Sequence, residues 1–227
     1  MKTKSCVFAA AVLLVGLAAP ATVRAQTFNF ANATPITLPA LGVATPAYPS
    51  LINVSGVPAN LAEITVTLNG LTHPFVADLN FVLQSPGGGT VALMIGAGSP
   101  DAGTEATGAV LLFRDSAATQ IPTDAELLSG TYRPTNADPN YSLPGDSTPP
   151  APYGDSLSSL QSGDPNGQWK LYVNNAGDDP GALANGWNLG FSVAVIPEAG
   201  TMVLFGVAAM FGTAGLATRR ARRTRIG

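Results

Sequence analysis

The sequence predicts an all-β sandwich that lies between a cleavable signal peptide and a single C-terminal transmembrane helix. Three observations predict this arrangement. The chain begins with a short apolar stretch that ends in small residues, apolar and polar residues alternate through its middle, and an uncharged run followed by arginines closes it. The length of the central part suits a single domain.

Residues 1–25 are typical of a secretory signal peptide. Two lysines precede the apolar stretch 7–19, and a small-x-small sequence ends at Ala25, so cleavage is expected before Gln26. The alternative, a first membrane anchor, is disfavoured by the shortness of the apolar stretch. The one cysteine, Cys6, leaves with the signal, so the mature chain is expected to lack disulfides and thiolate chemistry.

The run 201–217 carries no charge and has about the length that crosses a bilayer as a helix, roughly 17–25 residues. A buried helix of a soluble core would show a polar face, and this run shows none. An arginine cluster follows, and these side chains are expected to hold the C-terminus on the cytoplasmic side. The cluster is Arg219, Arg220, Arg222, Arg223 and Arg225.

The formal charge of −3 for the whole chain averages over unlike parts. Between residues 26 and 196 there are three basic residues against thirteen acidic ones, a formal charge of −10. Such a domain repels nucleic acid and anionic lipid, which excludes nucleic acid as a partner, and it attracts divalent cations.

Residues 26–46 show little periodicity and are interpreted as a leader, a linker or an edge strand. From residue 51 the apolar residues recur with a period of two, and Gly/Pro turns separate short strands. This pattern predicts a sandwich in which each sheet has one polar and one buried face. The expected strands are 64–68, 80–84 and 91–95 around the hairpin turn 85–90, 110–113, 169–173, and 187–195.

The segment 131–155 has many prolines and few aliphatic residues. We expect it to be a long surface loop that is held down by Tyr132, Tyr141 and Tyr153. Trp169 and Trp187 fall on the apolar faces of their expected strands, which favours core packing over a carbohydrate-binding platform.

A series of motifs in register between Tyr48 and Val195 resembles the P domain (P/Homo B) that follows the catalytic domain of subtilisin-like proprotein convertases. The resemblance implies a β jelly roll over residues 47–196. The motifs are Tyr48-Pro49-Ser50, Val66-Thr67-Leu68-Asn69-Gly70, Gln84-Ser85-Pro86-Gly87-Gly88, Phe113-Arg114-Asp115, Pro165-Asn166-Gly167-Gln168-Trp169, Gly177-Asp178-Asp179-Pro180-Gly181 and Gly186-Trp187-Asn188-Leu189.

The tail 197–227 is similar to a PEP-CTERM sorting signal, in which a Pro-Glu-Pro-like motif precedes a membrane span and an arginine cluster. The motif here is Pro197-Glu198-Ala199, with alanine where the family has its second proline. The resemblance implies cleavage by a membrane-bound, exosortase-like sorting enzyme and a transient or permanent stay in the inner membrane of a Gram-negative bacterium.

The parent family of the P domain is proteolytic, so catalysis must be considered. A Ser-His-Asp triad needs a histidine base, and the chain has only His73. No Gly-x-Ser-x-Gly elbow occurs, and a hydrogen-bonded structural histidine is favoured. Carboxylates are plentiful enough for a glycosidase pair, but no pattern marks one pair, so we predict no catalytic residues.

Calcium is the most plausible ligand of the acidic loops, because hard cations take carboxylate and carbonyl oxygens. A turn or solubility role for each of these residues is an open alternative. No cofactor is certain, and the candidate Ca²⁺ ligands are Asp78, Asp101, Glu105, Asp178 and Asp179.

Three functions remain open at this stage. The first is a non-catalytic binding or scaffold module that is exported, parked in the inner membrane, and then delivered to the cell surface or the extracellular matrix in association with exopolysaccharide. The second is an accessory domain for a separate subtilisin-like protease, and the third is a cryptic hydrolase.

Overall fold

The computed structural model describes residues 24–98 and 104–195. Residues 25–194 form one compact unit built from strands, and the described helices are two short 3₁₀ turns, η1 (Val76–Asp78) and η2 (Leu157–Leu160). No helix in these residues has the length and apolar character of a membrane span. The expected span 201–217, the sorting motif and the arginine cluster lie outside them.

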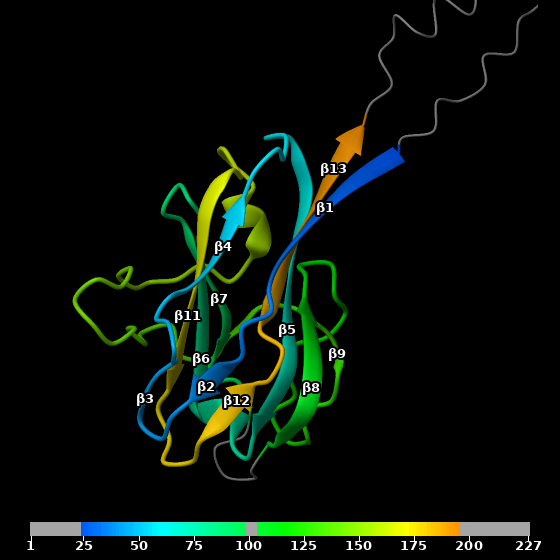
Figure 1. Ribbon diagram of the computed structural model, residues 1–227. Coiled ribbons are helices and arrows are strands. Elements are labelled where there is room, and N and C mark those ends of the chain that lie inside the picture. The colour runs from blue at the N-terminus through cyan, green and yellow to red at the C-terminus, as the bar shows by residue number, and fades with distance from the viewer. Residues whose placement is uncertain (1–23, 99–103, 196–227) are drawn as a thin grey trace, which may run out of the picture. The chain divides into compact units, whose positions relative to one another are not determined.

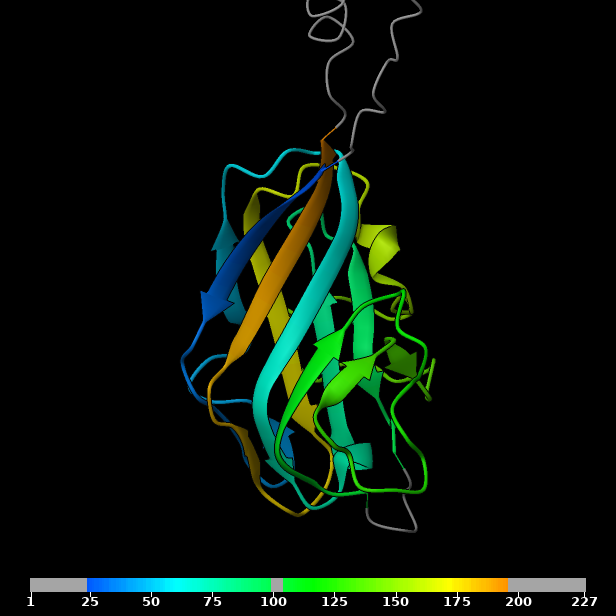
Figure 2. The same cartoon turned by 90° about the vertical axis from the view of Figure 1, so that its right-hand side faces the viewer.

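The described strands form two mixed sheets that pack face to face, which confirms the predicted all-β sandwich (Figure 1). Sheet A has the order β1-β13-β5-β12-β2, with β8 on the other edge of β5 and β9 beside β8. Figure 2 shows this sheet from its outer side. Its strands are β1 (Arg24–Asn32), β2 (Ile36–Leu38), β5 (Leu61–His73), β8 (Ala106–Phe113), β9 (Gly130–Tyr132), β12 (Gly181–Leu183) and β13 (Trp187–Val195).

Sheet B has the order β10-β7-β6-β11-β3, and β4 also pairs with β11. The expected hairpin is present, since β6 and β7 pair antiparallel across the turn 85–89. The strands of sheet B are β3 (Gly42–Val43), β4 (Ser50–Val54), β6 (Leu79–Gln84), β7 (Thr90–Ile95), β10 (Thr135–Asn136) and β11 (Gly167–Asn175). The segment 26–46, predicted to be a leader, a linker or an edge strand, contains most of β1 and the whole of β2 and β3.

The main core lies between the sheets and is built from the alternating residues of β5, β11 and β13. Trp169 and Trp187 are fully buried, as predicted, and each indole N–H is satisfied. Trp169 donates to the carbonyl of Pro165 at 2.8 Å, and Trp187 donates to the hydroxyl of Ser50 at 3.0 Å. Burying the ring while pairing its N–H is how tryptophan stabilises a core.

Sheet B departs from the expectation of one polar face per sheet. Five consecutive residues of β6, 79–83, are buried, so both faces of this strand are covered. The cover is a second apolar cluster in which Leu143 and Tyr153 of the long connection pack on Val82 and Tyr172. The segment 131–155 is therefore tied down by tyrosines, as predicted, but it also adds a third layer over sheet B.

Candidate functional site

The loops at one end of the sandwich carry His73 and the four calcium candidates that the structure describes. β13 ends beside Leu61, the first residue of β5, whereas His73 closes the other end of β5. The loops around His73 therefore lie opposite the ends at which β1 begins and β13 stops (Figure 1). We call these distal loops; they comprise residues 39–42, 73–78, 104–105 and 174–181.

His73 holds two of the distal loops together. The backbone N–H of Phe75 donates to Nδ1 at 3.0 Å, so Nδ1 carries no proton and Nε2–H donates to the carbonyl of Asp179 at 2.9 Å. The imidazole is 1% exposed, and its ring lies so close to Gly181 that a Cβ there would overlap it. Both ring nitrogens are engaged with backbone groups, so His73 is the structural histidine that was predicted and has no nitrogen left to act as a general base.

Asn175 is a second clamp, which sequence analysis missed. Its Nδ2 donates to the carbonyls of Pro39 (3.0 Å) and Asp179 (2.6 Å), and its Oδ1 accepts from the N–H of Gly177. The N–H of Leu41 then bonds to the carbonyl of Gly177 at 2.8 Å. Leu41 has a φ of +48°, which is costly for a branched side chain, and it is 66% exposed.

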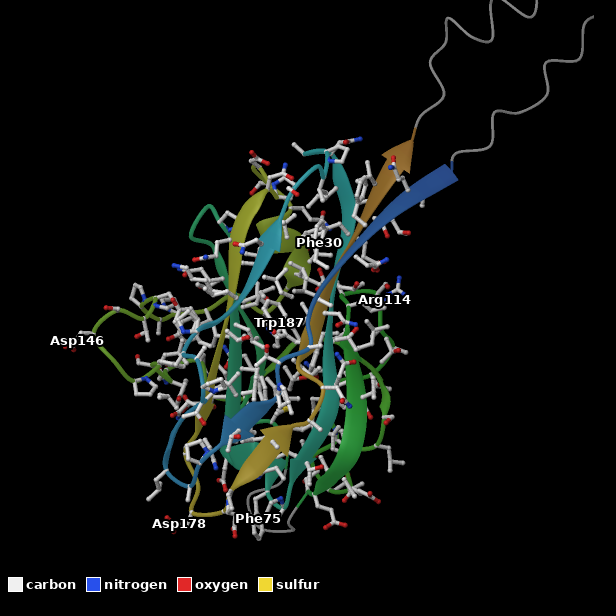
Figure 3. All side chains as sticks on the ribbon, viewed as in Figure 1. Phe30, Phe75, Arg114, Asp146, Asp178 and Trp187 are labelled. Carbon is white, nitrogen blue, oxygen red and sulfur yellow. The ribbon has the colours of Figure 1, made fainter. Side chains whose placement is uncertain are left out.

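The distal loops also collect the described calcium candidates. Ala176 N–H donates to the carbonyl of Asp78, and the Asp78 carboxylate lies against Gly177. Asp178, the next residue, lies at the same end of the domain (Figure 3). Glu105 joins the same end because its neighbour Thr104 accepts from the N–H of Val76. Among the residues that the structure describes, no group of three or more acidic, histidine or cysteine side chains is placed to hold a metal. Asp101 lies outside them, and calcium binding stays a prediction.

The other predicted site residues are at or beyond the ends of the described chain. The expected cleavage site, Ala25-Gln26, falls in the first residues of β1. The sorting motif Pro197-Glu198-Ala199 and the arginine cluster lie outside the described residues, and the structure does not test them.

A shallow apolar groove of about 370 Å³ adjoins the distal loops. Leu41, Val43 and Pro144 line it together with Tyr141 and Asn174. Asn174 Nδ2 donates to the hydroxyl of Tyr141 at 2.8 Å, and burial raises the pKa of this phenol, which keeps it neutral. The groove is therefore an uncharged surface beside acidic loops.

A second, polar pocket of about 460 Å³ lies on a different part of the sandwich. One of its walls is Asp115, whose carboxylate accepts from Ser156 Oγ, Leu157 N and Ser158 N at 2.7–2.8 Å. Burial opposes ionisation of Asp115, but these hydrogen bonds outweigh it and hold its pKa below the ordinary value. The other lining residues are Gln120, Arg133, Pro134, Asn136, Asp155 and Ser156.

Sequence analysis did not find the polar pocket, because its walls come from segments up to 41 residues apart, as in the contact of Ser156 with Asp115. Its residues resemble ordinary surface residues, and no local spacing connects them.

Comparison with known proteins adds little to this description. No family model matches the chain, and no curated protein matches it. A solved complex of the Aeromonas sobria serine protease (ASP) with the chaperone ORF2 is similar at 15% identity, over 76% of this chain and 27% of that one, with a TM-score of 0.34. A likeness this remote carries no argument about function.

Proposed function

We propose that the protein is a non-catalytic binding or scaffold module of P-domain type, exported by a Gram-negative bacterium and sorted to its surface by a PEP-CTERM-like tail. The observation that carries the proposal is the placement of the ends of the domain. β1 and β13 are neighbours in sheet A, and they begin and end opposite the distal loops. Attachment through the tail would therefore leave the distal loops free to bind.

The sorting step follows from the residues of the tail. The signal peptide starts export, the apolar run 201–217 stops it, and the arginine cluster keeps the C-terminus in the cytoplasm. An exosortase-like enzyme then cleaves near Pro197, two residues after the end of β13. The domain is released or transferred as a folded unit.

Intact-mass analysis of the surface fraction tests this proposal. We expect a chain that begins at Gln26 and ends near Pro197. Replacing the five arginines of the cluster by glutamine should abolish surface delivery, because it removes the charges that fix topology. The matched control, Lys170→Gln in the folded domain, should be delivered normally. An intact Met1–Gly227 chain dissolved in the cytosol would refute the proposal.

Exopolysaccharide is the partner that we propose for the exported module. The charge of −10 disfavours nucleic acid and anionic lipid, whereas neutral polysaccharide is not repelled. In a strain that cannot make exopolysaccharide, the released protein should shift from the cell surface to the medium. Unchanged retention at the surface would contradict this partner without affecting the sorting step.

A second candidate function is an accessory domain that docks on a subtilisin-like protease. Val110 of β8 and Leu128 are 44% and 60% exposed, and their segments are joined by a bond from Val110 N–H to Ser129 Oγ. Exposed apolar side chains that lie close together are the kind of surface that a docked partner would cover. A double Val110→Ser, Leu128→Ser variant should lose co-purification with a protease encoded beside it, while surface sorting continues.

A further inference from the structure

The polar pocket lies where the chain crosses from sheet A to sheet B. β9 pairs with β8 in one sheet, and β10, three residues further on, pairs with β7 in the other. Its walls are fixed by backbone hydrogen bonds, from Arg133 N–H to the carbonyl of Thr119 and from Ala92 N–H to the carbonyl of Gly154. The pocket therefore exists before any ligand arrives, which lowers the cost of binding.

Asn136 contributes a polar atom that lacks a partner. Its Oδ1 is buried and accepts no hydrogen bond from the residues that the structure describes. Buried side-chain oxygens are nearly always paired, and an unpaired one destabilises the fold. Asn136 is one of the residues that line the pocket, and a small rotation of its side chain would bring this oxygen to a donor from outside the chain.

Arg133 contributes donors in the same pocket. It is exposed, and it takes part in no ion pair within the described residues, whereas Arg114 is paired with Glu63. The two carboxylates that line the pocket differ in how free they are to accept a hydrogen bond from a ligand. Asp115 already accepts three hydrogen bonds from the start of η2, while Asp155 is exposed at the rim. One cavity is therefore lined by residues that carry free donors and free acceptors.

The charges of the walls narrow the class of ligand. An anion would meet two carboxylates, Asp115 and Asp155, against one guanidinium. A divalent cation would meet the guanidinium of Arg133 and a carboxylate whose oxygens are already engaged. Pro134 is the one apolar side chain among the lining residues, so a hydrophobic ligand would gain little. A neutral ligand whose groups both donate and accept fits best.

We propose that the polar pocket binds one or two units of a neutral saccharide. Hydroxyl groups donate to Asn136 Oδ1 and to Asp155, and they accept from Arg133. A volume of about 460 Å³ falls within the range of small-ligand pockets. This inference rests on the proposed function, since it assigns a site to the polysaccharide that the exported module would meet.

Calorimetric titration of the mature protein, purified from the exporting cells, tests the site. The probes are cellotriose, maltotriose and tri-N-acetylglucosamine, with tri-galacturonic acid and CaCl₂ for comparison. We expect at least one neutral trisaccharide to bind, and Asn136→Ala and Arg133→Ala to weaken it at least about tenfold, the scale of a lost hydrogen bond to a charged or buried group. The matched controls are Asn140→Ala, an exposed asparagine of the same connection, and Lys170→Ala, a cation on β11; both should bind normally.

The melting temperature separates a binding role of Asn136 from a structural one. Because its Oδ1 is unpaired, Asn136→Ala should not lower Tm in the absence of saccharide, although it abolishes the rise in Tm that saccharide causes. Asp155→Asn, at the exposed rim, provides a second variant whose folding is not at stake, and it should also bind more weakly.

Three results would overturn the inference: no neutral trisaccharide binds at millimolar concentration, the pocket variants bind as tightly as the parent protein, or calcium or the acidic saccharide binds at the pocket instead. These results leave the surface-delivery experiment unaffected. Conversely, an undelivered protein that still binds saccharide would refute the proposed function alone.

Discussion

The outer faces of the two sheets differ in their exposure to solvent. In sheet A, β5 alternates buried and half-exposed residues, so that Thr65 and Thr67 face outward while Val66 points into the core. In sheet B, Val82 also points away from the main core, yet it is fully buried beneath the connection that carries Leu143 and Tyr153. One sheet meets solvent directly and the other meets it through a third layer.

The difference shows that a long connection can be part of the core. Tyr153 Oη accepts from the N–H of Leu143 and donates to the carbonyl of Pro149, so the connection is bonded internally as well as packed. Tyr48 extends the cover by an edge-on contact with Tyr172, with ring centroids 5.4 Å apart. Such a loop is expected to tolerate substitution poorly, unlike ordinary surface loops.

Placing a charge on the outer face of each sheet should give the largest difference in the free energy of unfolding. Val82→Asp would bury a carboxylate without a partner and should lower the free energy of unfolding by about 4 kcal/mol or prevent folding. Thr67→Asp, at the corresponding outward position of β5, should cost about 1 kcal/mol or less. Guanidinium unfolding of both variants measures the difference, and equal losses would mean that the connection does not cover sheet B.

Removing one hydroxyl from each region should give a smaller contrast. Tyr153→Phe leaves the buried N–H of Leu143 without its acceptor and should cost about 1–3 kcal/mol. Tyr132→Phe removes an exposed bond to the carbonyl of Leu128 and should cost about 0.5 kcal/mol. Thermal unfolding of the pair measures these effects, and a larger loss for Tyr132→Phe would reverse our assignment of the buried cover.

The ion pair on the outer side of sheet A should contribute less still. Arg114 Nη2 lies 2.6 Å from Glu63 Oε1, but both side chains are partly exposed. Arg114→Lys, which loses the two-pronged geometry, should cost about 0.5 kcal/mol, and the loss should shrink in high salt. Arg133→Lys is the control without an ion pair. A loss that does not respond to salt would indicate that packing, and not charge, is responsible.

Alkaline pH should lower the free energy of unfolding mainly through the tyrosines that cover sheet B, and less through Tyr132 of sheet A. Stability at neutral pH should not change. Burial, and then the neighbouring tyrosines, raise the pKa of Tyr48 far above its ordinary value, and burial raises that of Tyr172. The unfolded chain loses these protons first, so stability is complete below about pH 10 and falls as pH rises further. Tyr48→Phe should make that fall shallower, and Tyr132→Phe should change it less. Denaturation midpoints measured over roughly pH 8–11, around the ordinary tyrosine pKa, give the slope. An equal slope in the Tyr48→Phe variant would contradict the assignment.

The periodicity of the sequence predicted the strands whose side chains form the core between the sheets. It did not predict the layer that covers the outer face of sheet B. Ile64, Val66 and Leu68 alternate with polar residues, which is enough to place β5. The unbroken apolar run of β6 is typical of a strand that is covered on both faces. The run does not indicate which segment of the chain covers it. The tyrosines of 131–155 indicated that this segment is held down, and they did not indicate onto which sheet.

The candidate sites were predictable to different degrees. His73 was assigned correctly because a single histidine without a nucleophile motif is most simply structural. Asn136 and Arg133 were missed because their significance depends on an oxygen and a guanidinium that lack a partner among the described residues. Pairing is a property of three-dimensional neighbours, which the sequence does not show.

The position of β13 has a mechanical consequence. The strand lies between β1 and β5 in sheet A and carries the chain out of the domain. A pull on the chain beyond Ala194 would act along this strand and would load the hydrogen bonds on both of its edges in shear. A domain loaded in this way should unfold slowly under tension, because many hydrogen bonds must break together.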